Sequence, residues 1–494
     1  METIGTVGMY LPYMDPQTKK IVLSTVKEAD NFCDFVQSLT KRACQPDSLE
    51  LTVFFAVHFA ALLFDFHCLN SLAKAHGRVP IIRPNLFYGS AIQGRHEDFE
   101  KVRESVDEVL STDLPDWLTL EMYLIRLEAE NAEYPKIVHD TKTLERIEDM
   151  LDENPEFDFF KSRLDDLLSI RAIRDGDVEK ALELNQSATE SAEKHNDVNR
   201  LAHLLRTRGG ILQSIDREET EAMLLRSRDL MESMGDKSGI SGVLFHLSKL
   251  ESISGRYDPA IEHNLECVRI GESISEPTGM YALTLSTLYN VVGRSDAGVE
   301  WARMAETELA NRPTLQPRAV LNQAWSMALQ NKLTEAHFLV DSVRESILKS
   351  GVESSLGWLY FVTSVLEAAE GQYSSAAISI EDALDIYERS GGYVSFYICL
   401  HHRAKYEVLA SEVANSSQAD ELIGPWLTSL EERSRDENLP GILGQALLLK
   451  ANLLASRGDI TNSMIVAEEL SSLVSENGLS FLEPAFSRLV GSFD

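Results

Sequence analysis

The chain has 494 residues, of which 44% are hydrophobic and 25% are charged, as in a folded protein. This length exceeds what a single compact core supports and is enough for two or three domains. Only 15 prolines and 27 glycines are present, too few for the frequent turns of an all-β protein, so long helices are favoured. The formal net charge of -32 argues against direct binding to nucleic acids or anionic membranes, because both repel an acidic chain.

The first 80 residues carry no repeat. Residues 4–15 and 19–25 are predicted to form two strands, a β-hairpin around a turn at Asp15 and Pro16. The segment has two interpretations. It is a cap for the first repeat, because a terminal repeat cannot leave its apolar face open, or it is a small specialised domain. We favour the cap.

Two helices are predicted next, over residues 26–42 and 49–74. The most apolar run, 51–64, is too short to cross a bilayer and contains His58, so it indicates a buried helix. The N-terminus has no basic region followed by an apolar core, so we expect no signal peptide.

The cysteines are too few and too scattered to suggest a disulfide framework or a structural zinc site. There are five, none in a CxxC pair: Cys33, Cys44, Cys68, Cys267 and Cys399. An odd number of dispersed cysteines is typical of a reducing compartment. We therefore expect a cytoplasmic protein.

Acidic residues are concentrated in the segment 95–160, which has 20 acidic and 7 basic residues. Most are expected on solvated helix faces, as are acidic pairs such as Asp165–Asp166 and Glu431–Glu432. The acidity of the chain has two interpretations: it keeps the protein soluble, or it reflects a preference for a basic partner. In the second case the segment 95–160 would be a docking strip whose binding depends strongly on salt.

A short sequence motif, called the repeat phrase below, recurs along the chain. It consists of a glycine, four variable residues and then a small residue that begins an amphipathic helix. Its clearest copies are GDVEKALELNQSA from Gly176, GRYDPAIEHNLEC from Gly255, GRSDAGVEWARMA from Gly293 and GQYSSAAISIEDA from Gly371. Weaker copies begin at Asn331, Gly458 and Gly94, and faded ones lie near Pro135, Ile215 and Ala414. The steps from Gly255 to Gly293, to Asn331 and to Gly371 are 38, 38 and 40 residues, a spacing that indicates a repeat protein.

The phrase has a physical explanation. The glycine is expected just past a helix end, where a left-handed backbone is needed. Small residues follow it by five and by twelve positions and precede it by seven, so that paired helices can approach closely. They are Ala181, Ala260, Gly298, Ala336 and Ala376; then Ala188, Cys267, Ala305 and Ala383; and upstream Ser248, Ser286, Ala324, Ser364 and Ala451.

These positions resemble the tetratricopeptide repeat (TPR) family over about four fifths of the chain, with a period of about 40 residues instead of 34. The terminal proline of that family is missing. The long period is similar to that of kinesin light chains, spindle-orientation scaffolds and bacterial sensor domains. The resemblance implies an all-α fold: a right-handed α-solenoid of about ten antiparallel helix pairs over residues 81–494, preceded by the segment 1–80.

In the TPR family the first helices of the repeats line a concave groove that holds a protein or peptide. The matching positions here are Phe245, Lys249, Leu283, Asn290, Arg318, Trp325, Trp358 and Phe361. Aromatic residues and arginine often dominate binding energy, so this set suits an extended or helical peptide. Alternatively, the aromatic residues pack against the neighbouring repeat. The Lys and Asn set that holds chaperone C-termini in some TPR domains is not found.

No catalytic signature is present: there is no Gly-Lys dipeptide and hence no P-loop, no HExxH, no GxSxG and no EF-hand loop. His58, His67 and His76 recur every nine residues on an otherwise apolar face, which indicates core or boundary histidines more than metal ligands. His401 and His402 are adjacent and point apart on a helix. We expect no enzyme activity, no cofactor and no metal site.

The leading functional interpretation is an interaction scaffold or adaptor without membrane insertion. The alternative is a regulatory sensor whose groove binds a peptide or small ligand and signals to a separate effector chain. A third possibility, an enzyme with its chemistry in the first 80 residues, has no recognisable set of catalytic residues. The sequence does not define the partner.

Overall fold

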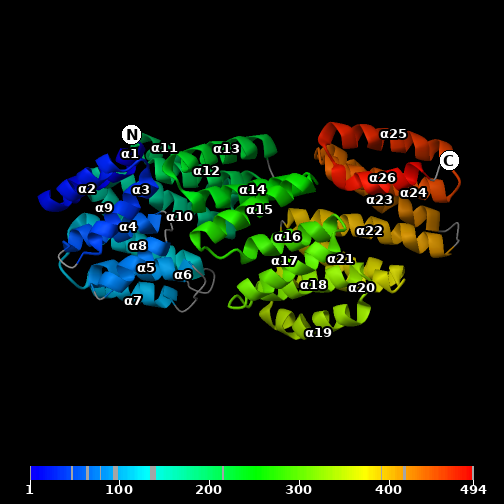
Figure 1. Cartoon of the computed structure of the whole chain (residues 1–494), viewed down its shortest axis with the longest axis horizontal. Helices are drawn as coiled ribbons and strands as arrows, with labels where there is room; N and C mark the ends of the chain where they lie inside the picture. The colour runs from blue at the N-terminus through cyan, green and yellow to red at the C-terminus, as the bar shows by residue number, and fades with distance from the viewer. Residues whose placement is uncertain are drawn as a thin grey trace. The chain divides into compact units, whose positions relative to one another are not determined.

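The computed structural model describes residues 2–45, 48–62, 66–77, 79–92, 98–133, 141–213, 216–390, 392–414 and 419–491. All regular structure in these ranges is helical, which confirms the all-α prediction for them. The chain divides into two compact units (Figure 1). Unit 1 comprises Met1–His246 and Ile270–Glu276, and unit 2 comprises Leu247–Arg269 and Pro277–Asp494. The predicted division at residue 80 stays a prediction.

The helices up to the end of α13 belong to unit 1. They are α1 (Glu2–Tyr10), α2 (Pro16–Glu28), α3 (Phe32–Ala43), α4 (Glu50–Leu62), α5 (Phe66–His76), α6 (Arg83–Ile92), α7 (Asp98–Leu110), α8 (Asp116–Glu133), α9 (Thr141–Glu153), α10 (Lys161–Arg174), α11 (Val178–Lys194), α12 (Val198–Leu212) and α13 (Arg217–Met234). Three 3-10 turns, Leu11–Tyr13, Pro80–Ile82 and Pro155–Phe160, join some of them.

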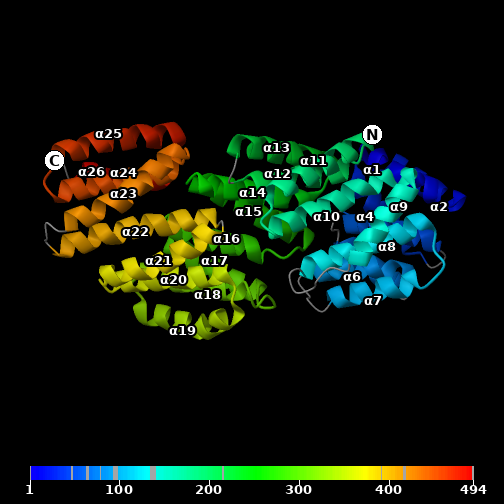
Figure 2. The same cartoon turned by 180° about the vertical axis from the view of Figure 1, so that it is seen from behind.

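Unit 2 contains the second half of α14 and most of α15, and then all later helices. They are α14 (Lys237–Ile253), α15 (Tyr257–Ile274), α16 (Gly279–Val291), α17 (Ser295–Glu308), α18 (Gln316–Leu329), α19 (Leu333–Ser350), α20 (Glu353–Ala369), α21 (Tyr373–Ser390), α22 (Tyr393–Ala414), α23 (Ala419–Asp436), α24 (Pro440–Ser456), α25 (Ile460–Asn477) and α26 (Glu483–Val490). Figure 2 shows α16 to α21 as antiparallel pairs stacked beside one another.

The predicted N-terminal β-hairpin was wrong, because the two segments are helical and lie in α1, the following 3-10 turn and α2. Asp15 is the N-cap of α2 instead of a hairpin turn residue: its carboxylate accepts hydrogen bonds from the backbone N–H groups of Gln17 (2.8 Å) and Thr18 (3.0 Å). Pro16 takes the first helical position, where a missing N–H leaves no bond unmade.

The next two predicted helices exist, with interruptions. The first is broken after Glu28, because Asn31 starts a new helix by accepting a hydrogen bond from the backbone N–H of Asp34 at 2.9 Å. The second corresponds to α4 and α5, and residues 63–65 between them lie outside the described residues. In its described part α4 is buried as predicted, and no helix among the described residues is long and apolar enough to span a membrane.

The turn residues of the repeats adopt the predicted left-handed backbone. Positive φ angles occur at Gly176, Gly255, Gly293, Gly371 and Gly458, and at Asn331, where φ is 59°. Asparagine tolerates this conformation better than most side chains do, which explains the weaker copy. The copies at Gly94 and near Pro135 and Ile215 lie outside the described residues.

The small residues lie where paired helices touch, and all of those predicted are buried. The close approach lets hydroxyl groups bond across the pair. The Ser248 hydroxyl donates to the carbonyl of Ala260 at 2.9 Å, and the Ser463 hydroxyl donates to the carbonyl of Ala451 at 2.8 Å. The small residues found in the sequence pattern therefore lie at the contact that holds the two helices of each hairpin together.

Unit 2 closes on itself. The backbone N–H of Gly441, at the start of α24, donates to the carbonyl of Ser254, just after α14, at 2.9 Å. The two backbones are so close that a Cβ on Gly441 would lie 2.1 Å from the carbonyl oxygen of Gly255. Nearby, the rings of Tyr257 and Phe481 meet edge to face with centroids 5.0 Å apart. The first hairpin turn of unit 2 thus contacts its last repeats.

We predict that Gly255→Ala destabilises unit 2 more than Gly293→Ala. Both glycines have left-handed backbones, with φ of 72° and 76°, so each alanine costs about 1–2 kcal/mol of strain. A Cβ on Gly255 also meets Gly441 at 2.7 Å, whereas one on Gly293 meets nothing within 4 Å. Overpacking of this kind adds about 1–3 kcal/mol.

Urea unfolding followed by circular dichroism measures the difference between these two variants. Equal losses of unfolding free energy in the two would contradict the closure of unit 2.

Candidate functional site

The candidate site lies on the first helices of successive repeats in unit 2. Helices α16, α18, α20 and α22 pack side by side in that order, with the second helices α17, α19 and α21 between them in sequence. We call the face that carries Lys249, Arg318, Trp358 and Lys405 the inner face. Of the groove residues predicted from the sequence, it carries Lys249 and Arg318, with Trp358 beneath Arg318.

An aromatic cluster forms the floor of the inner face. Trp325 of α18 and Trp358 of α20 each lie with their ring centroid 4.8 Å from that of Phe361, and Phe361 lies 5.1 Å from the ring of His402 on α22. The first three side chains are at most 1% exposed. The Trp358 indole N–H also donates to the Asn322 side chain at 2.7 Å. These rings pack between neighbouring repeats, which is the second of the two interpretations, and their role in binding stays a prediction.

The other predicted groove residues fall in different places. Leu283 and Asn290 are buried on α16, and the Asn290 side-chain oxygen accepts a hydrogen bond from the Ser326 hydroxyl at 2.7 Å. Lys249 and Arg318 are half-buried on the inner face. Phe245 belongs to unit 1, beside the ring of His246.

The guanidinium group of Arg318 packs on an aromatic ring and forms no ion pair with an acidic residue among the described residues. Its Cζ lies 5.3 Å from the centroid of the Trp358 ring, a cation–π distance. Its Nε is buried and has no hydrogen-bond acceptor, and no ion pair to Arg318 occurs among the described residues. A buried donor without a partner costs free energy, so the arrangement leaves a cation whose hydrogen-bonding capacity is not fully used.

Further cations lie on the inner face. Burial lowers the pKa of Lys249, and the nearby Arg318 lowers it further. Burial lowers the pKa of His402 to about 3, with Lys405 as the second cause, so His402 is neutral near pH 7. The pKa of Lys405 is also lowered by the surrounding protein, although its side chain is exposed to solvent.

The sequence analysis missed Lys405. The residue lies three positions after His402, on the same face of α22. The predicted groove positions could have been extended to α22, but the repeat motif that follows this helix is poorly preserved near Ala414. Without a recognisable turn residue, the position of each α22 residue within the repeat could not be assigned from the sequence.

The second helices carry an exposed apolar series that the sequence analysis also missed. Phe338, Ile378 and Ile465 are 73%, 68% and 59% exposed. Each lies seven residues after a turn residue, where the earlier repeats have Glu183, Glu262 and Glu300. Comparison of this position across the repeats would have revealed the change from glutamate to large apolar residues.

Unit 1 contains a buried charge network. Glu121 has no exposed surface and accepts from Arg163 at 2.6 Å, while His58 Nδ1 lies 3.3 Å from the same carboxylate. Arg163 also donates to Glu128 at 2.7 Å. Burial alone would raise the pKa of Glu121, but Arg163 and His58 lower it to about 2. The burial of His58 confirms the predicted core position; the side chain of His67 lies outside the described residues.

The predicted solvated face at Asp165–Asp166 was wrong. Both aspartates are 6% exposed, because Asp165 accepts from the Ser187 hydroxyl at 2.6 Å and Asp166 pairs with Arg200 at 3.2 Å. Burial raises the pKa of both carboxyl groups. In the acidic segment 95–160 the acids of α9 are exposed, as expected for a solvated face.

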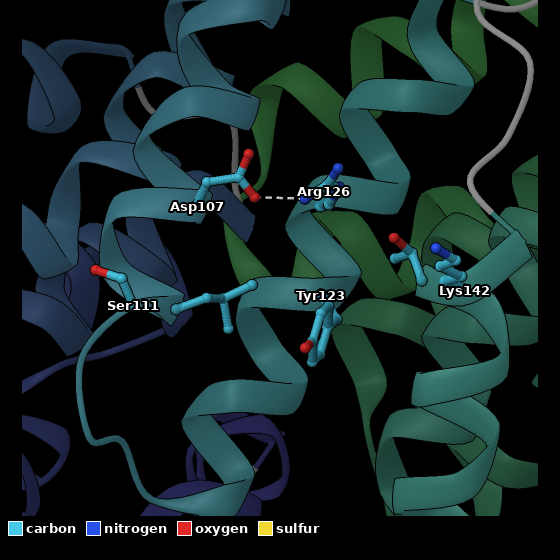
Figure 3. A pocket seen from close by; sticks show the side chains of 7 residues that line it. Asp107, Ser111, Tyr123, Arg126 and Lys142 are labelled. Carbon is cyan, nitrogen blue, oxygen red and sulfur yellow. Dashed lines mark hydrogen bonds and ion pairs between the residues drawn. The ribbon is translucent and has the colours of Figure 1, made fainter.

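A shallow pocket of about 400 Å³ lies between α7, α8 and α9 in unit 1 (Figure 3). It is lined by Asp107, Leu110, Ser111, Tyr123, Arg126, Lys142 and Thr143. Arg126 forms ion pairs with Asp107 and, at 3.1 Å, with Glu130. Its guanidinium is therefore already paired, and the pocket offers weaker support for a ligand than the inner face does.

No family model matches the sequence, and no curated protein matches it. Among solved structures, the chain is similar to a Rap protein complexed with competence and sporulation factor, at 11% identity over 67% of this chain and 97% of that chain, with a TM-score of 0.46. It is also similar to yeast Tom70, at 12% identity over 93% and 95% with a TM-score of 0.38.

A third similar structure is a signal transduction ATPase with a tetratricopeptide repeat sensor from Pyrococcus horikoshii, at 13% identity over 88% of this chain and 55% of that chain, with a TM-score of 0.37. At TM-scores below 0.5 these similarities assign neither a fold family nor a function to this chain.

We predict that Trp358→Ala lowers the unfolding free energy of unit 2 by about 3–5 kcal/mol, because it empties a buried site and removes the donor to Asn322. The matched control is Phe338→Ala, whose ring is 73% exposed and whose loss is expected within about 0.5 kcal/mol. Thermal and urea unfolding measure both. A small effect of Trp358→Ala would show that the aromatic floor is not a core.

We predict that Glu121→Gln costs about 1.5–3 kcal/mol near neutral pH, because it removes one of the two carboxylates that pair with the buried Arg163, the other being Glu128. The pKa of Glu121 is lowered to about 2 in the folded state, so its stabilisation is complete above the unfolded value of about 4.5 and is lost as the pH falls toward 2. The difference between wild type and variant should shrink over that range.

The control for this experiment is Glu193→Gln, which removes an exposed pair with Arg226 and should cost at most about 1 kcal/mol. Urea unfolding at several pH values measures all three proteins. A pH-independent difference between wild type and Glu121→Gln would contradict the ionised buried network.

Proposed function

We propose that the chain is a non-catalytic interaction module that holds a protein or peptide partner on the inner face of unit 2. The observation that carries this proposal is the alignment of α16, α18, α20 and α22, which gives one shared face with cationic side chains above a rigid aromatic floor. We also propose that its repeats are long-period repeats of the tetratricopeptide type, on the basis of the 38, 38 and 40-residue steps and their left-handed turns.

The aromatic floor supports this proposal in a different way from that expected. Trp325, Trp358 and Phe361 are too buried to be the main contacts of a partner. They instead fix the positions of the polar side chains above them, as the stacking of Arg318 on Trp358 illustrates. A surface whose side chains are already ordered loses less entropy when a partner binds.

The absence of catalysis is part of the proposal, as is a cytoplasmic location. Burial and the nearby Lys405 lower the pKa of His402 to about 3, which leaves this histidine neutral at physiological pH. A group that does not titrate near pH 7 is poorly suited to general acid–base catalysis. The partner would therefore be bound without chemical change.

A regulatory sensor is the second candidate, and the closure of unit 2 favours it. The hydrogen bond from Gly441 to Ser254 joins the two ends of the repeat array in this unit. A ligand that changes the curvature of the repeats would strain this contact, whereas a scaffold would keep it. Amide hydrogen exchange at Gly441 with and without partner separates the two functions.

We predict that a photoreactive benzoylphenylalanine in place of Lys405 captures a recurring protein or peptide when the chain is expressed in its native cells, because this exposed position lies on the inner face. The matched control places the same residue at Phe338, which is exposed on the second helix α19. Mass spectrometry identifies the adducts. Adducts from position 338 alone would move the partner to the apolar series of the second helices, and adducts from neither position would contradict an interaction module.

A further inference from the structure

The junction between α13 and α14 contains a buried carboxyl group that the proposed function does not use. We propose that Asp236 is a pH-dependent switch: the first two turns of α14 stay closed while its carboxyl group is protonated and open more often once it is ionised. This inference goes beyond the proposed function, because it concerns a regulation of the fold and does not depend on a partner. Asp236 belongs to unit 1, as do the first turns of α14.

Asp236 caps α14 with only one of its two carboxylate oxygens. Its Oδ1 accepts a hydrogen bond from the backbone N–H of Gly239 at 2.8 Å, which is the usual contact of a helix N-cap. Its Oδ2 is buried and has no hydrogen-bond partner among the described residues. The whole residue is only 4% exposed. One half of the carboxyl group is therefore shielded from water and left without a donor, which disfavours the charged form.

The surroundings of Oδ2 explain why it lacks a donor. A Cβ placed on Gly239 would lie against Oδ2 of Asp236 and 2.5 Å from the sulfur of Met231, so the oxygen and the thioether face the same small space. Met231 is fully buried, and a thioether has no hydrogen to donate to a carboxylate. The absence of a side chain on Gly239 thus gives the carboxyl group its room above the helix.

The other groups near Asp236 come from α3 and α12. Asn31 of α3 adjoins the turn, since a Cβ on Gly235 would lie 3.0 Å from its side-chain oxygen. Among the described residues, Arg206 of α12 is the charged side chain that acts on Asp236. Burial raises the pKa of Asp236 to about 6, against the smaller lowering effects of the hydrogen bond from Gly239 and of Arg206. The carboxyl group therefore changes its charge between about pH 5 and 7.

The first turns of α14 are poorly suited to stay helical by themselves. They contain Gly239 and Gly242, and glycine is among the least favourable residues in a helix. A Cβ on Gly242 would lie 2.5 Å from a terminal nitrogen of Arg206, so α12 packs too closely there for a larger residue. The start of α14 therefore depends on its N-cap more than the start of a glycine-free helix does.

The direction of the effect follows from the pKa in the two states. In the open state the carboxyl group is in water and has its ordinary pKa of 3.8, whereas in the closed state its pKa is about 6. The closed state thus binds the proton more tightly, so its extra stability is complete below the ordinary value and is lost as the pH rises through 6. About two pKa units correspond to an opening equilibrium about 100-fold larger well above pH 6 than in strong acid.

The test is hydrogen exchange of the full chain between pH 5 and 8, followed by mass spectrometry on peptides that cover residues 237–243 and corrected for the intrinsic pH dependence of exchange. In wild type we expect the protection of this segment to fall about tenfold over this range, as the two pKa values require. In Asp236→Asn it should not change with pH, because the amide keeps the N-cap acceptor but does not ionise.

The matched control is Asp216→Asn, which makes the same change at the exposed N-cap of α13, where the carboxylate accepts from the backbone N–H of Glu219 at 2.9 Å. The pH dependence of α14 should be the same in this control as in wild type. Gly239→Ala is a second variant: its methyl group displaces the carboxyl group toward water, so the pH dependence should shrink although the acid remains. Circular dichroism confirms that all variants are folded.

A direct titration shows whether Asp236 is the group concerned. With 13C-labelled aspartate, the carboxyl signal that is missing from Asp236→Asn should titrate near pH 6. A titration at the ordinary value would overturn the inference. So would a titration near pH 6 without any change in the exchange of residues 237–243, because the acid would then be buried without acting as a switch. An equal change in all peptides of unit 1 would show a general loss of stability and no local switch.

Discussion

The fold depends on the close contact between the two helices of each hairpin. At that contact the side chains are small, as at Ala260 opposite Ser248, and the backbones are near enough for a hydroxyl to bond to a carbonyl of the other helix. The contact sets the angle between the two helices of each pair, and the left-handed turn residue lets the chain reverse its direction between them. Because the same contact recurs every 38 to 40 residues from Gly255 to Gly371, the first helices are brought side by side and share one face.

That shared face explains why buried aromatics and cations occur together. Trp325, Trp358 and Phe361 fill the space between adjacent first helices, and the polar side chains above them have few positions left to adopt. Arg318 is held on a ring instead of by an acid, in a chain whose other charges are mostly acidic. Packing therefore positions the charges of this face. In unit 1 the same kind of helix pairing encloses ion pairs such as Glu121 with Arg163, and there the charges stabilise the fold.

The sequence predicted the repeats because a glycine turn and small contact residues are local and recur with a period. It failed where the deciding interaction was not periodic. Asp15 and Pro16 are a helix N-cap and first helical position as well as common turn residues, and no local pattern separates the two. Asp165 and Asp166 are buried by Ser187 and Arg200, which come from later helices. The predicted groove residues lie on the helices that precede the turn residues, and whether they line a groove stays a prediction. The burial of each residue depends on the neighbouring repeat, which the sequence of one repeat does not contain.

The central claim is that the partner lies on the inner face of unit 2, and the indole N–H signals of the five tryptophans report on it most directly. With selectively labelled tryptophan, a transverse-relaxation-optimised NMR titration follows Trp325 and Trp358 beneath the inner face, Trp301 on the second helix α17 and Trp117 in unit 1. If the partner binds on the inner face, it shifts the signals of Trp325 and Trp358 and leaves that of Trp117 in place. A shift confined to Trp117 or Trp301 would contradict it.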